Sequence, residues 1–136
     1  MLNPGDYSLC DLAVTTAINN VAQTPIQHLE GVVAATIEAK LSYGSGGTSL
    51  KAYVQVTLDD GQTWIDVACF AFTTSSAIRV INLSGLTPKT TAVAPTDGAL
   101  ADDTCVDGIL GSAMRVKLVS TGTYANTIIS VKMSVR

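Results

Sequence analysis

The chain has 136 residues, of which 14% are charged and 47% are hydrophobic, and its net charge is −3. This length suits one domain that buries a core of its own. The scattered Lys and Arg residues exclude the basic stripe of a nucleic-acid-binding protein. No apolar run approaches the roughly 18 residues of a membrane-spanning helix, and the start, MLNPGDYSLC, lacks the pattern of a secretion signal. We therefore expect neither nucleic acid nor a membrane as a partner.

Low charge with abundant Thr, Val, Ala and Gly is typical of an all-β protein. It is also typical of a subunit that hides part of its surface in an assembly, because monomers usually carry more charge for solubility. The three cysteines, Cys10, Cys69 and Cys105, have no C-x-x-C spacing, so neither a zinc site nor a redox pair is predicted. Their odd number favours a reducing compartment.

The N-terminal residues 1–8 contain Asn3-Pro4-Gly5 and predict a short arm, and alternation over residues 7–16 predicts a first strand. Residues 17–28 are polar and predict a loop with room for an edge segment. Residues 29–41 have the Ala, Glu and Lys content of a helix, but their alternation and β-branched side chains favour a strand. Residues 42–47, SYGSGG, predict a flexible link to the next strand.

Residues 50–72 predict a β-hairpin, because two apolar runs flank a short Asp-Asp-Gly corner. The first run alternates apolar with polar residues, as a half-buried strand does. The second run is largely apolar on both faces, with Trp64, Asp66, Ala68, Phe70 and Phe72 on one face and Ile65, Val67, Cys69 and Ala71 on the other. Such a strand is central in a sandwich or forms part of a subunit interface.

The corner of this hairpin, residues 57–64, resembles the Asp-box of sialidases, written S-x-D-x-G-x-T-W. The match includes Asp59, Gly61, Thr63 and Trp64, with Thr57 in place of Ser. In that family the box is a brace remote from the catalytic site, so the resemblance implies a structural turn and no glycosidase. Locally, an Asp side chain accepts backbone N–H groups across such a turn and the Trp ring packs beneath it.

Three further strands are predicted over residues 77–83, 114–120 and 127–136. In the second of these, Arg115 and Lys117 are expected on the wet side. The last strand alternates cleanly and is expected to form a hairpin with the strand before it. A long segment, residues 84–107, separates the first two, and insertions of this length tend to carry function or inter-subunit contacts.

These elements predict an all-β fold, an antiparallel β-sandwich of about seven to eight strands and of jelly-roll or Ig-like type. The domain is expected to span residues 1–136, with the arm at 1–8 and the long loop at 84–107. The order of strands in the sheets stays open.

No constellation of residues predicts an enzyme or a cofactor. The only histidine, His28, has no acidic or nucleophilic neighbour, and a surface histidine is the expected role. The acidic loop residues Asp97, Asp102, Asp103 and Asp107 are weak candidates for a calcium site, but they lack D-x-D-x-D-G spacing. Asp59 and Asp60 are explained by the turn. A sugar-binding platform of Tyr43, Tyr53, Tyr124 and Trp64 is disfavoured, because the tyrosines are dispersed and Trp64 is expected in the core.

The runs YGSGGT at 43–48, DDGQTWID at 59–66 and STGTYANT at 120–127 resemble small structural proteins of tailed phages, prophages and gene-transfer particles. The resemblance extends over about two-thirds of the chain. It implies a β-sandwich virion protein that assembles in multiple copies in the host cytoplasm, with no catalytic residue to carry over. The stretch AYVQVTLDDGQTW at 52–64 is also similar to the hairpin of discoidin-like carbohydrate-binding jelly rolls.

The sequence thus predicts a non-enzymatic virion protein, foremost a capsid decoration or cement subunit that forms a homo-oligomer and docks on the major capsid protein. A tail-tube, tail-terminator or connector subunit is the structural alternative, and a carbohydrate-binding module for host attachment is the other. Inter-subunit contacts are expected in the N-terminal arm and the long loop. The candidate interface residues are Ile65, Val67, Cys69, Pro88 and Pro95.

Overall fold

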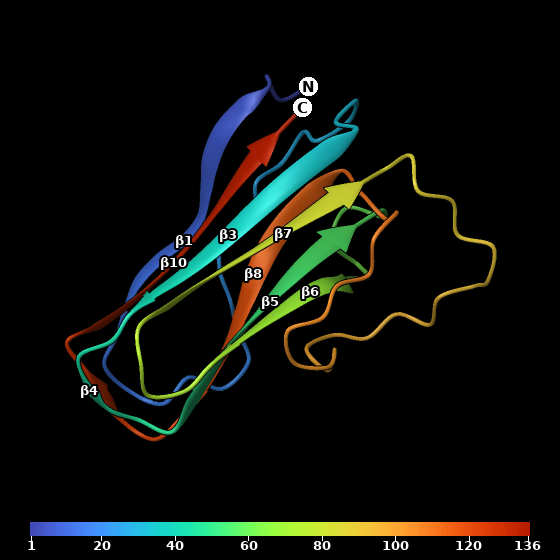
Figure 1. The fold of residues 1–136 in the computed structure, drawn as a ribbon. Coiled ribbons are helices and arrows are strands. Elements are labelled where there is room, and N and C mark those ends of the chain that lie inside the picture. Colours follow the sequence, from blue (N-terminus) through green and yellow to red (C-terminus); the bar gives the residue numbers. More distant parts are fainter.

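The computed structural model describes residues 1–136 as two antiparallel four-stranded sheets packed face to face (Figure 1). The strand orders are β1-β10-β3-β7 and β2-β8-β5-β6, with a two-stranded β4-β9 pair beside them. The strands are β1 Gly5–Val14, β2 Val21–Ala22, β3 Ala34–Ser42, β4 Ser45–Gly46, β5 Ser49–Thr57, β6 Ile65–Phe72, β7 Ala77–Ser84, β8 Ala113–Thr121, β9 Tyr124–Ala125 and β10 Thr127–Val135. The all-β prediction is confirmed.

The strand pairing is that of a jelly roll. When the short strands β4 and β9 are set aside, the first strand pairs with the last, β1 with β10. The pairs β2–β8, β3–β7 and β5–β6 follow in the same nested order. This is a long antiparallel ribbon folded over into two sheets. Of the two sandwich types that the sequence left open, the chain adopts the jelly roll.

The core lies between the sheets and comprises 25 buried residues. β3 shows the underlying pattern most clearly, because Ala35, Ile37, Ala39 and Leu41 are buried and the residues between them are exposed. Successive side chains of a strand point to opposite faces, so one face of β3 joins the core. The strand interpretation of this segment is confirmed over the helical one.

The predicted hairpin is β5 and β6, the one case in which long strands consecutive in sequence pair with each other. A register shift between Val54 and Gln55 marks a β-bulge at Val67 of β6. The extra residue at the bulge reverses which side chains of β6 point into the core before it along the chain. Asp66 therefore lies opposite Gln55 and does not join Phe70 in the core. The predicted grouping of Asp66 with the two phenylalanines is therefore wrong.

The predicted final hairpin is also wrong. β8 pairs with β5 and β2, whereas β10 pairs with β1 and β3 in the other sheet. The turn between them crosses from one layer to the other. Each strand buries alternate side chains in the shared core, so its amphipathy is the same whether its neighbour lies beside it or across from it.

The segment SYGSGG is ordered by packing, which corrects its prediction as a flexible link. β4 pairs with β9, and the Tyr124 ring is buried with its hydroxyl donating to the Thr73 carbonyl at 2.8 Å. Gly47 has φ of 72°, and a Cβ there would lie 2.4 Å from the Tyr124 ring. Glycine is required at this position because the backbone passes directly against the ring.

The N-terminal arm is shorter than predicted, since β1 begins at Gly5 and pairs with β10 from there. A bulge in β1 near Leu9 buries both Leu9 and Cys10. Residues 1–4 also contact their own chain, with the Leu2 amide donating to the His28 carbonyl. The two termini lie close together at one end of the sandwich (Figure 1).

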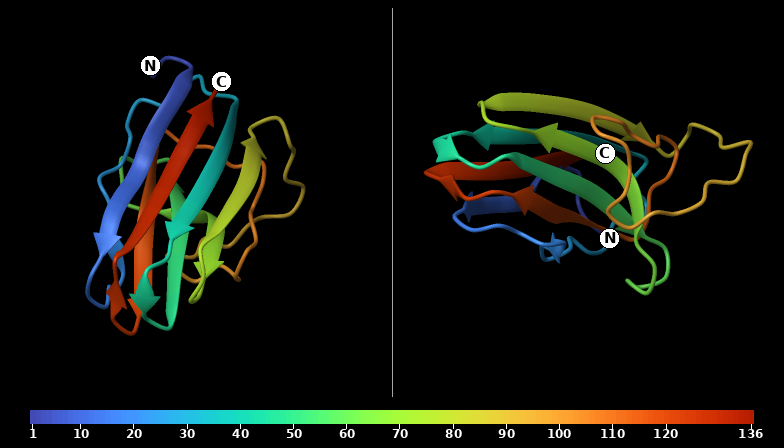
Figure 2. Two further views of the ribbon diagram at one scale, coloured as in Figure 1. Left: turned by 60° about the vertical axis from the view of Figure 1, so that its left-hand side comes forward. Right: turned by 90° about the horizontal axis from the view of Figure 1, so that it is seen from below.

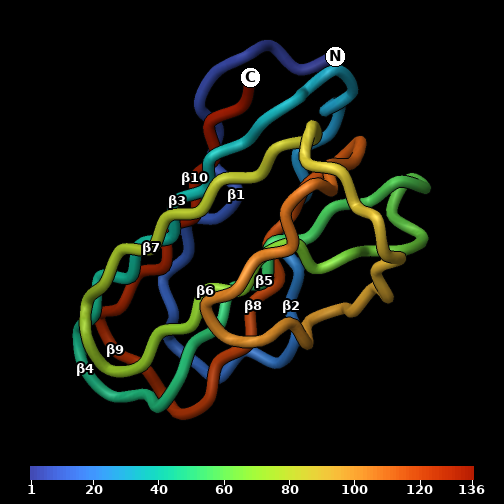
Figure 3. Tube along the Cα trace, turned by 45° about the vertical axis from the view of Figure 1, so that its right-hand side comes forward, coloured from blue at the N-terminus to red at the C-terminus, as the bar shows by residue number.

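Residues 85–112, here called the covering loop, join β7 to β8. Residues 86–95 are exposed and extend away from the sandwich (Figure 2). The chain then returns along β6 to reach β8 (Figure 3). On the return it bonds the free edge of β6, because Cys69 N donates to Thr104 O at 2.9 Å and Val106 N donates to Val67 O at 2.8 Å.

Candidate functional site

Asp66 anchors the covering loop. Its side chain is 2% exposed and accepts from three consecutive loop amides, those of Gly98 (2.8 and 2.9 Å), Ala99 (2.9 Å) and Leu100 (3.2 Å). The Thr96 hydroxyl adds a bond of 2.8 Å. A buried carboxylate is tolerated only when its lone pairs are occupied, and here the loop backbone occupies them. The β6 bulge makes this contact possible by turning Asp66 outward.

Gln55 links this anchor to the neighbouring charges. It is fully buried, and its Nε2 donates to Asp66 Oδ1 at 2.9 Å and to Asp97 Oδ1 at 2.6 Å. Its Oε1 accepts from Arg115 Nε at 2.8 Å. Lys117 Nζ lies 3.0 Å from Asp97 Oδ1. The Gln55 amide thus joins Asp66 and Asp97 to Arg115, and Lys117 contacts Asp97 directly. No buried side-chain polar atom of the structure lacks a partner.

These contacts change the protonation and exposure of the groups involved. The hydrogen bond from Gln55, reinforced by Lys117, holds the pKa of Asp97 below its ordinary value. Partial burial lowers the pKa of Arg115. The side chains of Arg115 and Lys117 are only 18% and 14% exposed. The face of β8 that was predicted to be open to solvent is therefore largely covered.

Trp64 lies outside the core, which corrects the prediction that it belongs there. Its ring is partly exposed, and the Arg115 guanidinium sits 4.1 Å from the ring centroid. This is cation–π geometry, in which the ring face attracts the cation. Trp64 thus closes the polar network at the outer surface.

The corner in which Asp59, Gly61, Thr63 and Trp64 predict a structural turn is held by local hydrogen bonds. Asp59 Oδ1 accepts from the Thr63 amide at 2.8 Å, which lowers the pKa of Asp59. Thr57 Oγ1 donates to Asp59 at 3.0 Å and accepts from the Gly61 amide at 2.9 Å. Gly61 has φ of 87°, as the tight corner requires. Thr57, which stands where the Asp-box has Ser, therefore bonds to both Asp59 and Gly61.

The four loop aspartates proposed as weak calcium candidates do not converge, and no cluster of three or more His, Cys, Asp or Glu side chains is placed to hold a metal ion. Each has separate partners. Asp97 is bonded as described above, and Asp102 pairs with Lys51 at 2.8 Å. Asp103 pairs with Arg79 at 3.2 Å and accepts from the Ala71 amide.

The fourth of these aspartates, Asp107, accepts from the Ser84 amide at 2.7 Å and the Thr87 hydroxyl at 3.0 Å. The bond from the Ser84 amide lowers its pKa. Asp107 therefore ties the covering loop to the end of β7. All four residues hold the loop in place instead of facing a common ion.

The remaining candidates are also dispersed. His28 is exposed in a loop with φ of 65°. Tyr53 and Tyr124 are buried, so the four aromatic residues form no sugar platform. Burial raises the pKa of the Cys10 and Cys69 thiols to about 11, whereas Cys105 is exposed.

The candidate interface residues divide into two groups. Val67 is 0% exposed as part of the core, and Cys69 is 1% exposed beneath the covering loop, so neither presents a surface to a partner. Ile65 is partly buried, and Pro88 and Pro95 are exposed on the projecting part of the loop. The second apolar face of β6 is thus covered by the chain itself, which corrects the interface interpretation for Val67 and Cys69.

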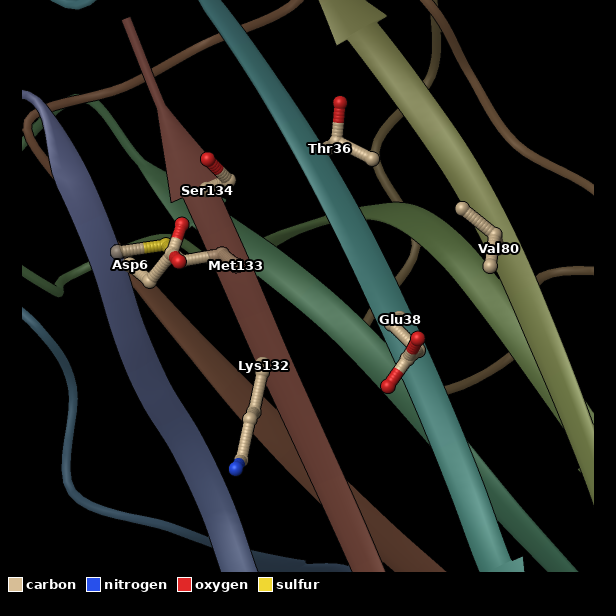
Figure 4. Close-up of a pocket in the computed structure, with 7 residues that line it drawn as sticks. All are labelled: Asp6, Thr36, Glu38, Val80, Lys132, Met133 and Ser134. Carbon is tan, nitrogen blue, oxygen red and sulfur yellow. The ribbon is translucent and has the colours of Figure 1, made fainter.

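The sheet β1-β10-β3-β7 is here called the bare sheet, because no segment of the chain covers its outer face. A shallow hollow of about 290 Å³ crosses it, lined by Asp6, Thr36, Glu38, Val80, Lys132, Met133 and Ser134 from all four strands (Figure 4). Glu38 and Lys132 are cross-strand neighbours but form no ion pair. Large apolar side chains are exposed on this face, with Ile78 and Val80 each at 57% and Ile128 at 46%.

The polar network around Asp66 was not predicted from the sequence. One signal was present, because Asp66 is the lone charged residue in a strand that is otherwise apolar. Gln55 gave no such signal, since polar and apolar residues alternate in β5. None of the hollows of the structure is lined by Asp66, Gln55 or Arg115. With its acceptors occupied and no space for a substrate, the network serves to anchor the loop.

Comparisons of the chain with protein-family models, curated proteins and solved structures return no match. The structure contains no helix of the length and apolarity needed to cross a bilayer. The chain is thus defined by its fold as an antiparallel jelly roll in which one sheet has a covered outer face and the other a bare one.

Proposed function

We propose that the chain is a non-enzymatic structural subunit of a tailed-phage virion or related particle, and foremost a decoration subunit that stabilises the assembled head. The observation that carries the proposal is the uncovered outer face of the bare sheet. Exposed apolar side chains on one face mark interaction surfaces, and this face combines three of them with unpaired charges.

The jelly-roll topology supports the same proposal. This fold is frequent in viral capsid domains, although a fold by itself does not specify a function. A subunit that binds only the assembled lattice would lower the free energy of that lattice by mass action. The particle would then resist expansion and heat.

Two other functions are compatible with the sequence. A tail-tube, tail-terminator or connector subunit would use the same sheet face for assembly. A carbohydrate-binding module draws support from the fold, because lectin domains are also jelly rolls. The hollow on the bare sheet has no aromatic lining, however, and sugar-binding loops usually present aromatic or basic tips.

Purified chain mixed with assembled empty capsids tests the proposal. Co-sedimentation of the chain with capsids, and a higher melting temperature of the decorated capsids, are the expected results. An antibody to the chain, followed by electron microscopy of complete particles, distinguishes head from tail labelling. Absence of the chain from particles, combined with retention on a glycan array, would reject the virion role in favour of the carbohydrate-binding module.

A further inference from the structure

The sandwich has four edge strands, and three of them are protected against pairing with another chain. β1 carries a β-bulge and two aspartates, Asp6 and Asp11. β2 is only two residues long, and the edge of β6 is bonded to the covering loop. Bulges, charges, shortness and covering segments are the devices by which proteins prevent edge-to-edge association.

The fourth edge, β7, has no bulge between Ala77 and Asn82, and no backbone bond joins these residues to the covering loop. It pairs with β3 in unbroken register and contains neither proline nor lysine. Its one charge, Arg79, is paired with Asp103 of the same chain at 3.2 Å. Residues 77–82 of this regular strand are thus left with an open edge.

The backbone direction of β7 follows from the bonds at its end. Gly85 N donates to Val33 O toward β3, whereas Ser84 N donates outward to Asp107. Alternate residues of a strand direct their backbone groups to the same side, so Ile78, Val80 and Asn82 share the outward direction of Ser84. Their amides and carbonyls have no partner within the chain.

The side chains on this edge are apolar as well. Ile78 and Val80 are each 57% exposed, although β-branched residues of this kind are usually at least half-buried in sheets. The projecting part of the covering loop leaves the molecule beside the end of β7 (Figure 2). It adds two exposed apolar side chains, with Leu86 at 80% and Val93 at 38%.

We propose that the free edge of β7 pairs antiparallel with β7 of a second copy, about a two-fold axis at Val80, so that two bare sheets form one continuous eight-stranded sheet. The inference rests on the proposed structural role and names its self-association surface. It places the contact on the open edge instead of on the buried residues Val67 and Cys69.

A second copy fits this edge because the strand is self-complementary. The two-fold places Val80 opposite its own counterpart and Ile78 opposite Asn82 of the other copy. Each of the three pairs exchanges two backbone bonds, about six in total. Like charges do not meet in these pairs, since the three residues are uncharged.

The contact is small, so a weak dimer is expected in solution. Edge pairing of one strand falls below the roughly 1,200 Å² of total buried area that is typical of stable complexes. In a particle, where each copy is held at several points, the same contact is strengthened by high effective concentration. Concentration-dependent association is therefore the expected behaviour of the purified chain.

Sedimentation velocity of the wild-type chain over a wide concentration range tests the contact. The double variant I78K/V80K should stay monomeric, because it places four lysines in one dimer contact. The matched control Leu58→Lys changes a residue that is 66% exposed in the hairpin corner and should dimerise as wild type does. A wild-type chain that stays monomeric throughout, or an I78K/V80K variant that still dimerises, overturns the proposal.

Disulfide crosslinking tests the register. In a Cys105→Ser background, Val80→Cys should form a covalent dimer on mild oxidation, because paired antiparallel residues have Cα atoms about 5.5 Å apart and disulfides span that distance. Asn82→Cys alone should crosslink much less, since its counterpart lies opposite Ile78. Efficient crosslinking through Asn82→Cys with little through Val80→Cys would contradict the two-fold at Val80.

Binding to capsids separates this inference from the proposed function. A wild-type chain that forms the β7 dimer but ignores assembled particles would reject the virion role and leave the dimer standing. An I78K/V80K variant that loses capsid binding while wild type shows no self-association would assign the edge to another particle protein, which overturns the second copy as its occupant.

Discussion

The two sheets of this jelly roll differ in whether the covering loop lies over their outer faces. All four ion pairs of the structure connect the covering loop to Lys51, Arg79, Arg115 or Lys117. On the outer face of the bare sheet, Glu38 and Lys132 form no ion pair. Arg79 of β7 does pair with the loop, but its side chain lies over Phe72 and alternates with the exposed Ile78 and Val80. The loop is therefore part of the folded structure, and the bare sheet with its β7 edge is the surface left for other molecules.

The largest effect is expected from removing the anchor of the loop. Asp66→Ala would leave the amides of Gly98, Ala99 and Leu100 and the Thr96 hydroxyl without their acceptor, and Gln55 Nε2 would keep only Asp97. Each buried donor left without a partner costs about 1–3 kcal/mol, so a loss of about 3 kcal/mol or more in the free energy of unfolding is expected. Urea unfolding measures it.

The same substitution should expose the Cys69 thiol, which lies under the loop. In a Cys105→Ser background, labelling of Cys69 by a thiol reagent should be faster with Asp66→Ala than without it. Cys10, buried in the other sheet, serves as the internal standard and should stay protected. Equal labelling of both thiols would indicate global unfolding, and unchanged labelling would contradict the anchoring role.

A smaller effect is expected in the hairpin corner. Thr57→Val removes the hydroxyl that bonds both Asp59 and the Gly61 amide while keeping the size and branching of the side chain. The expected loss is about 1–2 kcal/mol in the free energy of unfolding. Thr57→Ser keeps the hydroxyl and is the matched control. A valine variant as stable as the serine variant would show that the brace contributes little.

Acid should loosen the covering loop before it unfolds the bare sheet. The pKa values of Asp97 and Asp107 are lowered in the fold, so the folded chain binds fewer protons than the unfolded chain at mildly acidic pH. This contribution to stability is present above the ordinary aspartate pKa and is lost as pH falls through the lower folded values, below about pH 4.

Hydrogen exchange measured at a series of pH values follows this acid effect residue by residue. Amides of residues 96–107 should lose protection at higher pH than those of β3 and β10. The change is expected to be modest, because Asp97 is exposed and Asp107 is partly exposed, so water screens their interactions. Loss of protection at the same pH in both regions would reject the difference between the two sheets.

The smallest effect on stability is expected at the open edge. The I78K/V80K variant changes two exposed side chains that contact nothing essential, so its free energy of unfolding should stay within about 0.5 kcal/mol of wild type. Thermal and urea unfolding at low protein concentration measure this without the contribution of self-association. A loss as large as that of Asp66→Ala would mean that the edge contributes to the fold itself.

The sequence by itself determined the strands, because alternation reports which residues face a core. β3, β7 and β10 were predicted from this pattern, as was the β5–β6 hairpin with its Asp-Asp-Gly corner. The bonding of Asp59, Gly61 and Thr63 was predictable too, since it lies within a few residues of chain. These features depend on local geometry.

The tertiary structure alone decided which strands pair and which surfaces are covered. Alternation in β8 and β10 is the same whether they share a sheet or face each other, so the predicted hairpin between them was wrong. The bulge at Val67 turned Asp66 toward a loop that is distant in sequence. Because both outcomes depend on contacts between remote segments, no local pattern could specify them.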